Sequence, residues 1–145
     1  MDPIFLLLNQ HHEADDELAA VEAAVRDGDW AEAERRFAAF ERSLTGHFNL
    51  EETRLFPAFE QATGMRFGPT VVMRDEHACI LELLENCREP LREHDAQVLL
   101  SEVDTLLVMI QQHNVKEENV LYPMCRLRVA DLERVVGEDN MVVSP

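Results

Sequence analysis

The sequence predicts an all-α fold, an up-down-up-down four-helix bundle with a short C-terminal helix. Apolar residues recur every three or four positions through four long segments, which is the spacing that gives a helix one buried face. Only 5 Gly and 6 Pro interrupt the 145 residues, and 46% of the residues are hydrophobic, a composition typical of a compact helical protein. No segment shows the strict alternation of a half-buried strand. Because the connections between the segments are short, neighbouring helices are expected to be antiparallel.

The first helix is delimited by clear start and stop signals. Asp2-Pro3 combines an N-cap residue with a proline at the first helical position. The apolar spacing then continues to Arg26, where Asp27-Gly28-Asp29 ends the helix. Asp29 can in turn cap the second helix.

The second and third helices meet at a glycine-rich connection. The second helix runs to about Ala62, after which Gly64 and Gly68-Pro69 interrupt the chain. The third helix is expected from about Thr70 to Arg88, where Glu89-Pro90 ends it.

The fourth helix begins at Asp95, which can act as its N-cap, and is expected to run to about Arg128. A short final helix is predicted near residues 130–136, followed by a loose tail from Met141 to Pro145. We expect one domain over residues 1–145, with the bundle over about 3–128 and a C-terminal extension over 129–145.

Charge and cysteine content narrow the classes of function. The net charge of −16 argues against nucleic acid or an anionic membrane as a partner. The three cysteines, Cys79, Cys87 and Cys125, are odd in number and form no C-x-x-C pair, which indicates a reducing compartment. The N-terminus lacks the basic region of a signal peptide, and no segment approaches a membrane span. The expected location is the cytoplasm.

A pattern of metal-binding residue types occurs twice, 66 residues apart. In each copy a lone His precedes a His-x-x-x-Glu by 36 residues, and an apolar-aromatic-proline triplet follows. The first copy contains His11, His47, Glu51 and Leu55-Phe56-Pro57, and the second contains His77, His113, Glu117 and Leu121-Tyr122-Pro123. Both prolines are expected to kink or loosen their helices.

Helix lengths bring the four histidines to one level. His11 precedes the first turn by about 16 residues, and His47 follows the Asp29 cap by 18. The second copy repeats these spacings, because His77 precedes the turn at residue 93 by 16 residues and His113 follows Asp95 by 18. At a rise of 1.5 Å per residue, all four lie roughly 25 Å from the turns.

The donor set predicts two metal ions. Residues four apart share one face of a helix, so each His-x-x-x-Glu can direct both side chains at a common centre. A single His on an amphipathic helix is more often solvated or hydrogen-bonded, but a doubled pattern at one height favours metal. Six ligands exceed the needs of one tetrahedral zinc, and they suit two metals with two His each and two shared Glu. Imidazole and carboxylate together favour iron, with manganese and zinc as competitors.

These residues resemble the hemerythrin-like (HHE cation-binding) domain family, over residues 1 to about 128. That family's motif contains a first-helix His, a His-Phe-x-x-Glu-Glu followed by Leu-Phe-Pro, a third-helix His and a final His-x-x-x-Glu-Glu. The resemblance implies two iron ions with an oxo or hydroxo bridge, with Mn or Zn possible in their place. It implies that one iron is bound by His11 and His47, the other by His77 and His113, and that Glu51 and Glu117 bridge them.

The chain departs from the oxygen-carrying hemerythrins at two positions. Those proteins have a fifth His one turn before the third-helix His, where this chain has Met73. They also place the last carboxylate five residues after its His, which would be Glu118, whereas the internal repeat favours Glu117. The chain is therefore more similar to the four-His, two-Glu members linked to nitric-oxide defence, iron-centre repair and iron sensing.

The expected function is binding of, or reaction with, the small oxidants O₂, NO or peroxide in sensing or stress defence. The alternatives are an iron carrier or sensor, an iron-centre repair protein, and an interaction module whose metal only stabilises the bundle. No general acid or base stands out beyond the ligands, so catalytic residues and enzymatic activity stay unassigned. The sequence does not identify a protein partner.

Several further residues carry weaker expectations. His12 is expected to face away from the site, and His94 to be solvated in the loop before the fourth helix. Asp15 is expected either to hydrogen-bond a liganding imidazole or to be a surface acid. Cys79 lies off the ligand face. The residues expected to form plain core are Trp30, Phe48, Phe56, Phe59, Met73, Ile80, Met109 and Ile110.

Overall fold

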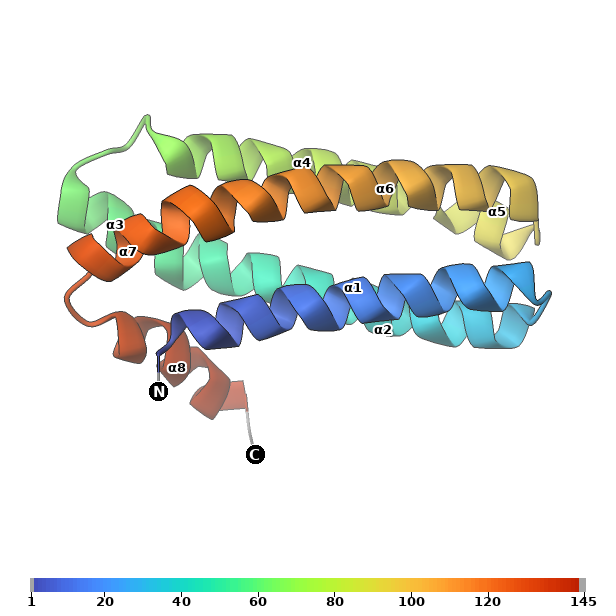
Figure 1. Cartoon of the computed structure of the whole chain (residues 1–145), viewed down its shortest axis with the longest axis horizontal. Helices are drawn as coiled ribbons and strands as arrows, with labels where there is room; N and C mark the ends of the chain where they lie inside the picture. The colour runs from blue at the N-terminus through green and yellow to red at the C-terminus, as the bar shows by residue number, and fades with distance from the viewer. Residues whose placement is uncertain (1, 144–145) are drawn as a thin grey trace.

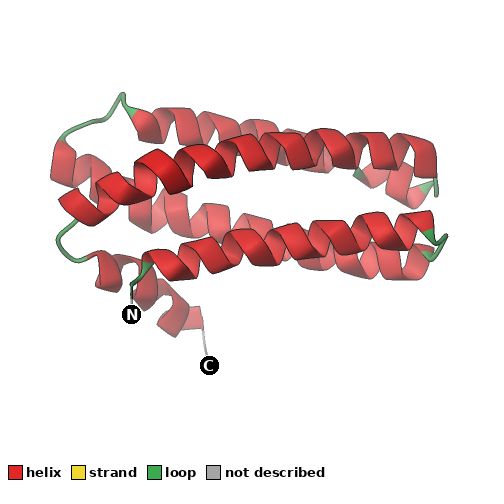
Figure 2. Ribbon diagram, in the orientation of Figure 1, coloured by secondary structure: helices red, strands yellow, loops and turns green. Residues whose placement is uncertain are grey.

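The computed structural model describes residues 2–143, and the side chains of residues 2–137. Four long helices alternate in direction along the chain: α1 (Ile4–Arg26), α2 (Trp30–Leu50), α4 (Pro69–Asn86) and α6 (Ala96–Lys116) (Figure 1). α1 packs against α2 and α6, and α4 packs against α6. Within residues 2–143 every regular element is a helix, which confirms the predicted all-α bundle (Figure 2).

Shorter helical segments extend the four long ones. α2 continues through the π-helix η1 (Glu51–Leu55) into α3 (Phe56–Thr63), and α6 continues through η2 (Glu117–Leu121) into α7 (Tyr122–Arg128). The remaining segments are α5 (Arg88–Arg92) and α8 (Leu132–Val143). We call the end with the connections at 27–29 and 93–95 the turn end. The opposite end, which holds α3, α7 and α8, is the open end (Figure 1).

The predicted start signals act as caps. Asp2 Oδ1 accepts a hydrogen bond from the backbone N–H of Ile4 at 3.0 Å. Asp29 caps α2 by accepting from Glu32 N at 3.1 Å, and Asp95 caps α6 by accepting from Val98 N at 3.2 Å. Each carboxylate satisfies a backbone donor that the first helical turn leaves unpaired. The caps at the turn end therefore fix where α2 and α6 begin, and so how far along each helix His47 and His113 lie.

The two π-helices lie where Pro57 and Pro123 were expected to loosen the chain. An α-helical proline lacks its N–H and collides with the carbonyl four residues earlier, and the wider π-turn relieves that collision. In its place the N–H of Phe56 donates to Glu51 O, and the N–H of Tyr122 donates to Glu117 O. Residues five apart thereby come to lie on one face of the helix. Phe56 lies on the same face as Glu51, and Tyr122 on the same face as Glu117.

Two predicted boundaries differ from the structure. The third helix was expected to run to about Arg88, with Glu89-Pro90 ending it, but α4 ends at Asn86 and Pro90 lies inside α5. There it is the third residue of the helix, where the missing N–H costs nothing because first-turn donors have no intrahelical partner. The final helix is also longer than expected, and the part of the predicted loose tail within the described residues, up to Val143, is helical. Burial of Leu132 and Val136 in the open-end core anchors this helix.

The apolar core consists of two clusters separated by a polar layer. The cluster at the turn end includes Phe37, Phe40, Phe48 and Ile80. The cluster at the open end includes Ile4, Leu7, Phe56, Phe59, Met73, Tyr122 and Val136. Of the expected core residues, Phe48, Phe56, Phe59, Met73, Ile80 and Ile110 are buried, while Trp30 and Met109 are partly buried against the turn-end cluster. The polar layer between the clusters is thus closed to water along the bundle axis.

Removing a fully buried aromatic ring at the turn end should weaken the whole bundle. Phe40→Ala is expected to lower the free energy of unfolding by about 3–5 kcal/mol, because Phe40 is 0% exposed and a cavity would remain. The control Val108→Ala, at a side chain 51% exposed, should change it by no more than about 0.5 kcal/mol. Urea unfolding of the metal-free variants measures both, and equal losses would contradict this account of the core.

Candidate metal centre

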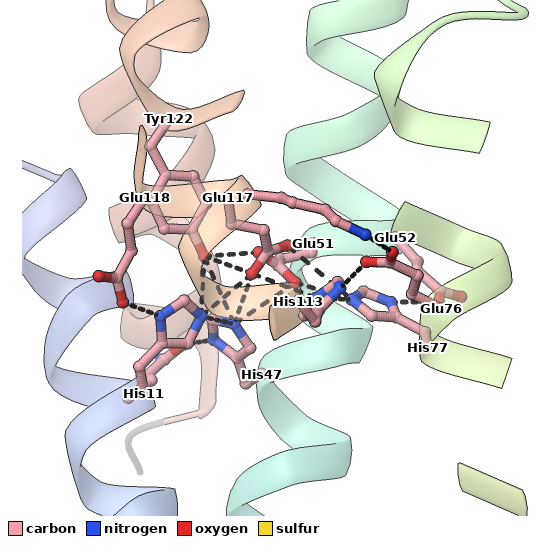
Figure 3. Close-up of polar contacts among 12 residues, drawn as sticks. His11, His47, Glu51, Glu52, Glu76, His77, His113, Glu117, Glu118 and Tyr122 are labelled. Carbon is pink, nitrogen blue, oxygen red and sulfur yellow. Dashed lines mark hydrogen bonds and ion pairs between the residues drawn. The ribbon is translucent and has the colours of Figure 1, made fainter. Parts of the chain in front are cut away.

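The side chains of the doubled pattern meet inside the bundle (Figure 3). None of the six is more than 4% exposed, and two of them are entirely buried carboxylates. They form two groups in which the possible ligand atoms all lie within 4.8 Å of one another. The first group is His11, His47, Glu51 and Glu117, and the second is Glu51, His77, His113 and Glu117.

The imidazoles face each other in two pairs. His11 Nε2 lies 3.0 Å from His47 Nε2, and His77 Nε2 lies 3.1 Å from His113 Nε2. Each pair joins two helices, α1 with α2 and α4 with α6. The four histidines therefore lie at one level of the bundle, as their equal distances from the turns predicted.

Both glutamates lie between the two pairs. Glu51 Oε1 lies 3.4 Å from His47 Nε2 and 3.1 Å from His77 Nε2. Glu117 Oε1 lies 3.1 Å from His11 Nε2 and 3.3 Å from His113 Nε2. Each carboxylate thus approaches one imidazole of each pair, the arrangement expected of a carboxylate that is shared between two ions.

Two carboxylate oxygens that lack a hydrogen bond suit this cluster to cations. Glu51 Oε1 and Glu117 Oε2 are buried and have no hydrogen-bond partner. Burying a carboxylate oxygen without a hydrogen bond costs free energy. Two imidazole nitrogens in contact also repel each other unless a proton or a cation lies between them. The six residues therefore form two His/Glu groups suitable for a dinuclear metal site.

The outer nitrogen of every imidazole has its own partner. His11 Nδ1 lies 2.7 Å from Glu118 Oε2, and His77 Nδ1 lies 2.6 Å from Glu52 Oε2. A ring that donates from Nδ1 to a carboxylate presents the Nε2 lone pair to the interior, so these contacts orient the rings as metal ligands require.

The other two histidines are held in the same way by different residues. His47 Nδ1 lies 2.6 Å from Gln10 Oε1, and His113 Nδ1 lies 2.8 Å from Glu76 Oε1. Lys116 pairs with the second oxygen of Glu76. Sequence reasoning missed these partners, although the 66-residue offset relates Gln10 to Glu76 as it relates Glu52 to Glu118.

The structure distinguishes the two candidate carboxylates after His113. Glu117 is 0% exposed and points into the cluster, whereas Glu118 lies outside it against the outer nitrogen of His11 (Figure 3). Glu118 also takes the hydrogen-bonding role that was one of the two alternatives for Asp15. His12 and Cys79 are exposed, in agreement with their predicted orientation.

Met73 and His94 belong to neither of the two His/Glu groups. Met73, one turn before His77, is buried in the open-end apolar cluster. His94 is exposed as expected, but its ring also stacks on Trp30, with the ring centroids 4.7 Å apart. Its backbone has a positive φ of 57°, at the connection before α6.

Tyr122 is a member of the cluster that the sequence did not single out. Its hydroxyl donates to Glu51 Oε2 at 2.6 Å and lies 3.1 Å from Glu117 Oε1. The position related to it by the repeat is Phe56, whose ring centroid lies 5.6 Å from that of His77. Phe48 stacks on the same imidazole, with centroids 3.7 Å apart. The repeat therefore differs at the aromatic residue that follows each π-turn.

The electrostatics of the metal-free cluster favour the protonated imidazoles of His47 and His113. Burial lowers the pKa of His47, but the neighbouring carboxylates of Glu51 and Glu117 outweigh burial and raise this pKa to about 10. The pKa of His113 is also raised, since Glu117 outweighs burial there. Burial raises the pKa of Glu117, but the neighbouring imidazoles of His11, His113 and His47 lower it well below its usual range. Burial and the charges of Glu51 and Glu117 raise the pKa of Tyr122 well above its ordinary value.

Comparisons with known proteins agree with the donor set. The family model described as the hemerythrin HHE cation binding domain matches residues 2–125. Comparison with the curated proteins and with the solved structures gave no significant match. Among the described residues, no helix is long and apolar enough to cross a membrane.

Metal uptake should release protons and weaken as the pH falls. The pKa of His47, about 10 against an ordinary 6.5, leaves this ring charged at neutral pH, and a metal ion must displace its proton. Affinity for Zn²⁺ should rise between pH 6 and pH 9, by about tenfold per pH unit for each proton released. Calorimetry in two buffers of different ionisation enthalpy measures the release. Binding that is independent of pH and of buffer would contradict this charge balance.

Proposed function

Because the chain belongs to the hemerythrin HHE cation-binding domain family, we propose that it is a non-haem di-iron protein that binds or reacts with small oxidants. Candidate oxidants are O₂, NO and peroxide, and the proposed role is sensing or stress defence. The observation that carries the proposal is the pair of buried carboxylate oxygens without a hydrogen bond, on Glu51 and Glu117, between two facing pairs of imidazole nitrogens.

The proposed ligands divide between two ions. One ion would be held by His11 and His47 and the other by His77 and His113, with Glu51 and Glu117 shared between them. Neither group contains a thiolate. Burial raises the pKa values of Cys87 and Cys125 to about 12, so both remain thiols within the apolar clusters. A set of imidazoles and bridging carboxylates favours iron over zinc.

Side chains around the ligands would control access and orientation. The outer nitrogen of each imidazole is held by one side chain, from Glu52, Glu118, Glu76 or Gln10. These contacts fix the direction of the imidazole lone pairs that point into the cluster. Phe48 covers one face of His77, and the apolar clusters close both ends of the polar layer. When bound, the iron pair would supply the electrons for chemistry with a small oxidant.

Direct titration tests the proposed reactivity. Reduced, iron-loaded protein is titrated anaerobically with O₂, NO and peroxide, and its optical spectrum is recorded. The proposal expects a saturable spectral change with at least one of the three. Iron that reacts with none of them would favour a structural metal in an interaction module. Ready loss of iron to a chelator, coupled to unfolding, would favour an iron carrier or sensor.

Removing a shared carboxylate should abolish the binding of both ions. Glu51→Ala and Glu117→Ala each leave two cations without a common anion, so iron content per chain should fall from two towards zero. Glu118→Ala is the matched control, since it removes only the outer partner of His11 and should weaken affinity by about 10–100-fold while both sites remain. Iron analysis after loading measures these contents. Loss of iron in Glu118→Ala alone would place the shared carboxylate one residue later.

Met73 leads to a prediction about oxidation in air. It lies one turn before His77, and a thioether is a weak, soft ligand for iron, so the ion at His77 should keep a place for a small molecule. The reduced protein should therefore be oxidised rapidly and irreversibly by air. Met73→His supplies an imidazole there and should slow the oxidation, which stopped-flow absorption can follow. Reversible O₂ release under vacuum from the unmodified protein would instead indicate an O₂ carrier.

A further inference from the structure

The two halves of the cluster have the same imidazoles and carboxylates but different aromatic residues. Phe56 and Tyr122 occupy related positions, each directly after a π-turn that starts at a shared glutamate. Phe56 gives the His77 side an apolar wall, whereas Tyr122 gives the other side a hydroxyl group. The chain therefore provides one half with an oxygen atom that the other half lacks.

The Tyr122 oxygen lies among the donor atoms of the first half. It is 3.2 Å from His11 Nε2 and 3.5 Å from His47 Nε2. The donor atoms already described are separated by similar distances, such as the 3.0 Å between those two nitrogens. Tyr122 is 0% exposed, and its ring projects from the start of α7 towards His11 and His47 (Figure 3).

The position of the hydroxyl is a consequence of the backbone. In an α-helix, residues five apart point in different directions, but η2 brings Tyr122 onto the face of Glu117. Pro123, which follows at once, favours this wider turn because it cannot donate a backbone hydrogen bond. The ring also stacks on His11, with centroids 5.7 Å apart, which holds the hydroxyl beside the nitrogen pair.

We propose that Tyr122 is a further protein ligand, whose oxygen binds the metal ion held by His11 and His47. This inference rests on the proposed di-iron function. A phenolate oxygen is hard and anionic, and it suits ferric iron as the carboxylates do. On binding, the O–H bond breaks, an oxygen–iron bond forms and the proton leaves to the buffer. The cation's charge reverses the local electrostatics that favour the neutral phenol in the metal-free protein.

A tyrosine ligand on one side makes the two ions different. The ion at His11 and His47 gains an oxygen donor from the protein. The ion at His77 and His113 faces the apolar rings of Phe48 and Phe56. A small exogenous molecule should therefore bind on the second side, where the protein leaves a position vacant.

Spectroscopy of the ferric protein tests this directly. Tyr122 is the only tyrosine in the chain, so any phenolate signal belongs to it. Protein loaded with ferric iron should show a visible phenolate-to-iron absorption and resonance Raman modes of a bound phenolate ring. Tyr122→Phe should lose both signals while keeping two irons per chain. The matched variant Phe56→Tyr places a phenol in the other half, and it should raise the absorption towards double the original value.

Iron analysis of the same samples separates this inference from the proposed function. Two irons per chain without phenolate modes in the unmodified protein would overturn the tyrosine ligand and leave the di-iron function intact. Phenolate modes with one iron per chain would support the ligand and contradict the di-iron function. A chain that binds no iron would overturn both. Because the unmodified protein decides these outcomes, none depends on whether a variant folds.

Discussion

Two buried carboxylates in contact with four imidazoles require positive charge, and the rest of the structure is arranged around this requirement. Glu51 and Glu117 are fully buried, and each has an oxygen without a hydrogen-bond partner. In the metal-free protein the charge comes from protons, which is why the pKa values of His47 and His113 are raised. Metal ions would supply the same charge with more suitable geometry. The apolar clusters on both sides keep water from satisfying these groups instead.

Helix register produces the cluster, and two departures from α-helical geometry refine it. The caps at Asp29 and Asp95 start α2 and α6 at the same distance from their histidines. The π-turns then rotate the chain so that an aromatic ring follows each glutamate on the same face. In one half that ring is Phe56, and in the other it is Tyr122. An internal repeat therefore builds a site with two similar halves that differ at this aromatic residue and, outside the imidazoles, at Gln10 and Glu76.

The helices and the convergence of the ligands could be predicted from the sequence, because both depend on local spacing. Apolar periodicity and cap residues locate the long helices, and equal distances from the turns bring the histidines to one level. The contacts outside the imidazoles could not be predicted in this way. Whether Glu118 or Asp15 reaches His11 depends on how neighbouring helices are rotated, which spacing within one helix does not determine. Tyr122 was missed because positions five apart share a face only in a π-turn.

Anomalous diffraction from crystals of the iron-loaded protein tests the central claim most directly. The account predicts two iron peaks per chain in the polar layer, roughly 3.5–4 Å apart as in other two-metal sites. One peak should lie beside His11 and His47 and the other beside His77 and His113, with Glu51 and Glu117 between them. A single peak bound by only some of these residues, or iron bound elsewhere on the acidic surface, would contradict it.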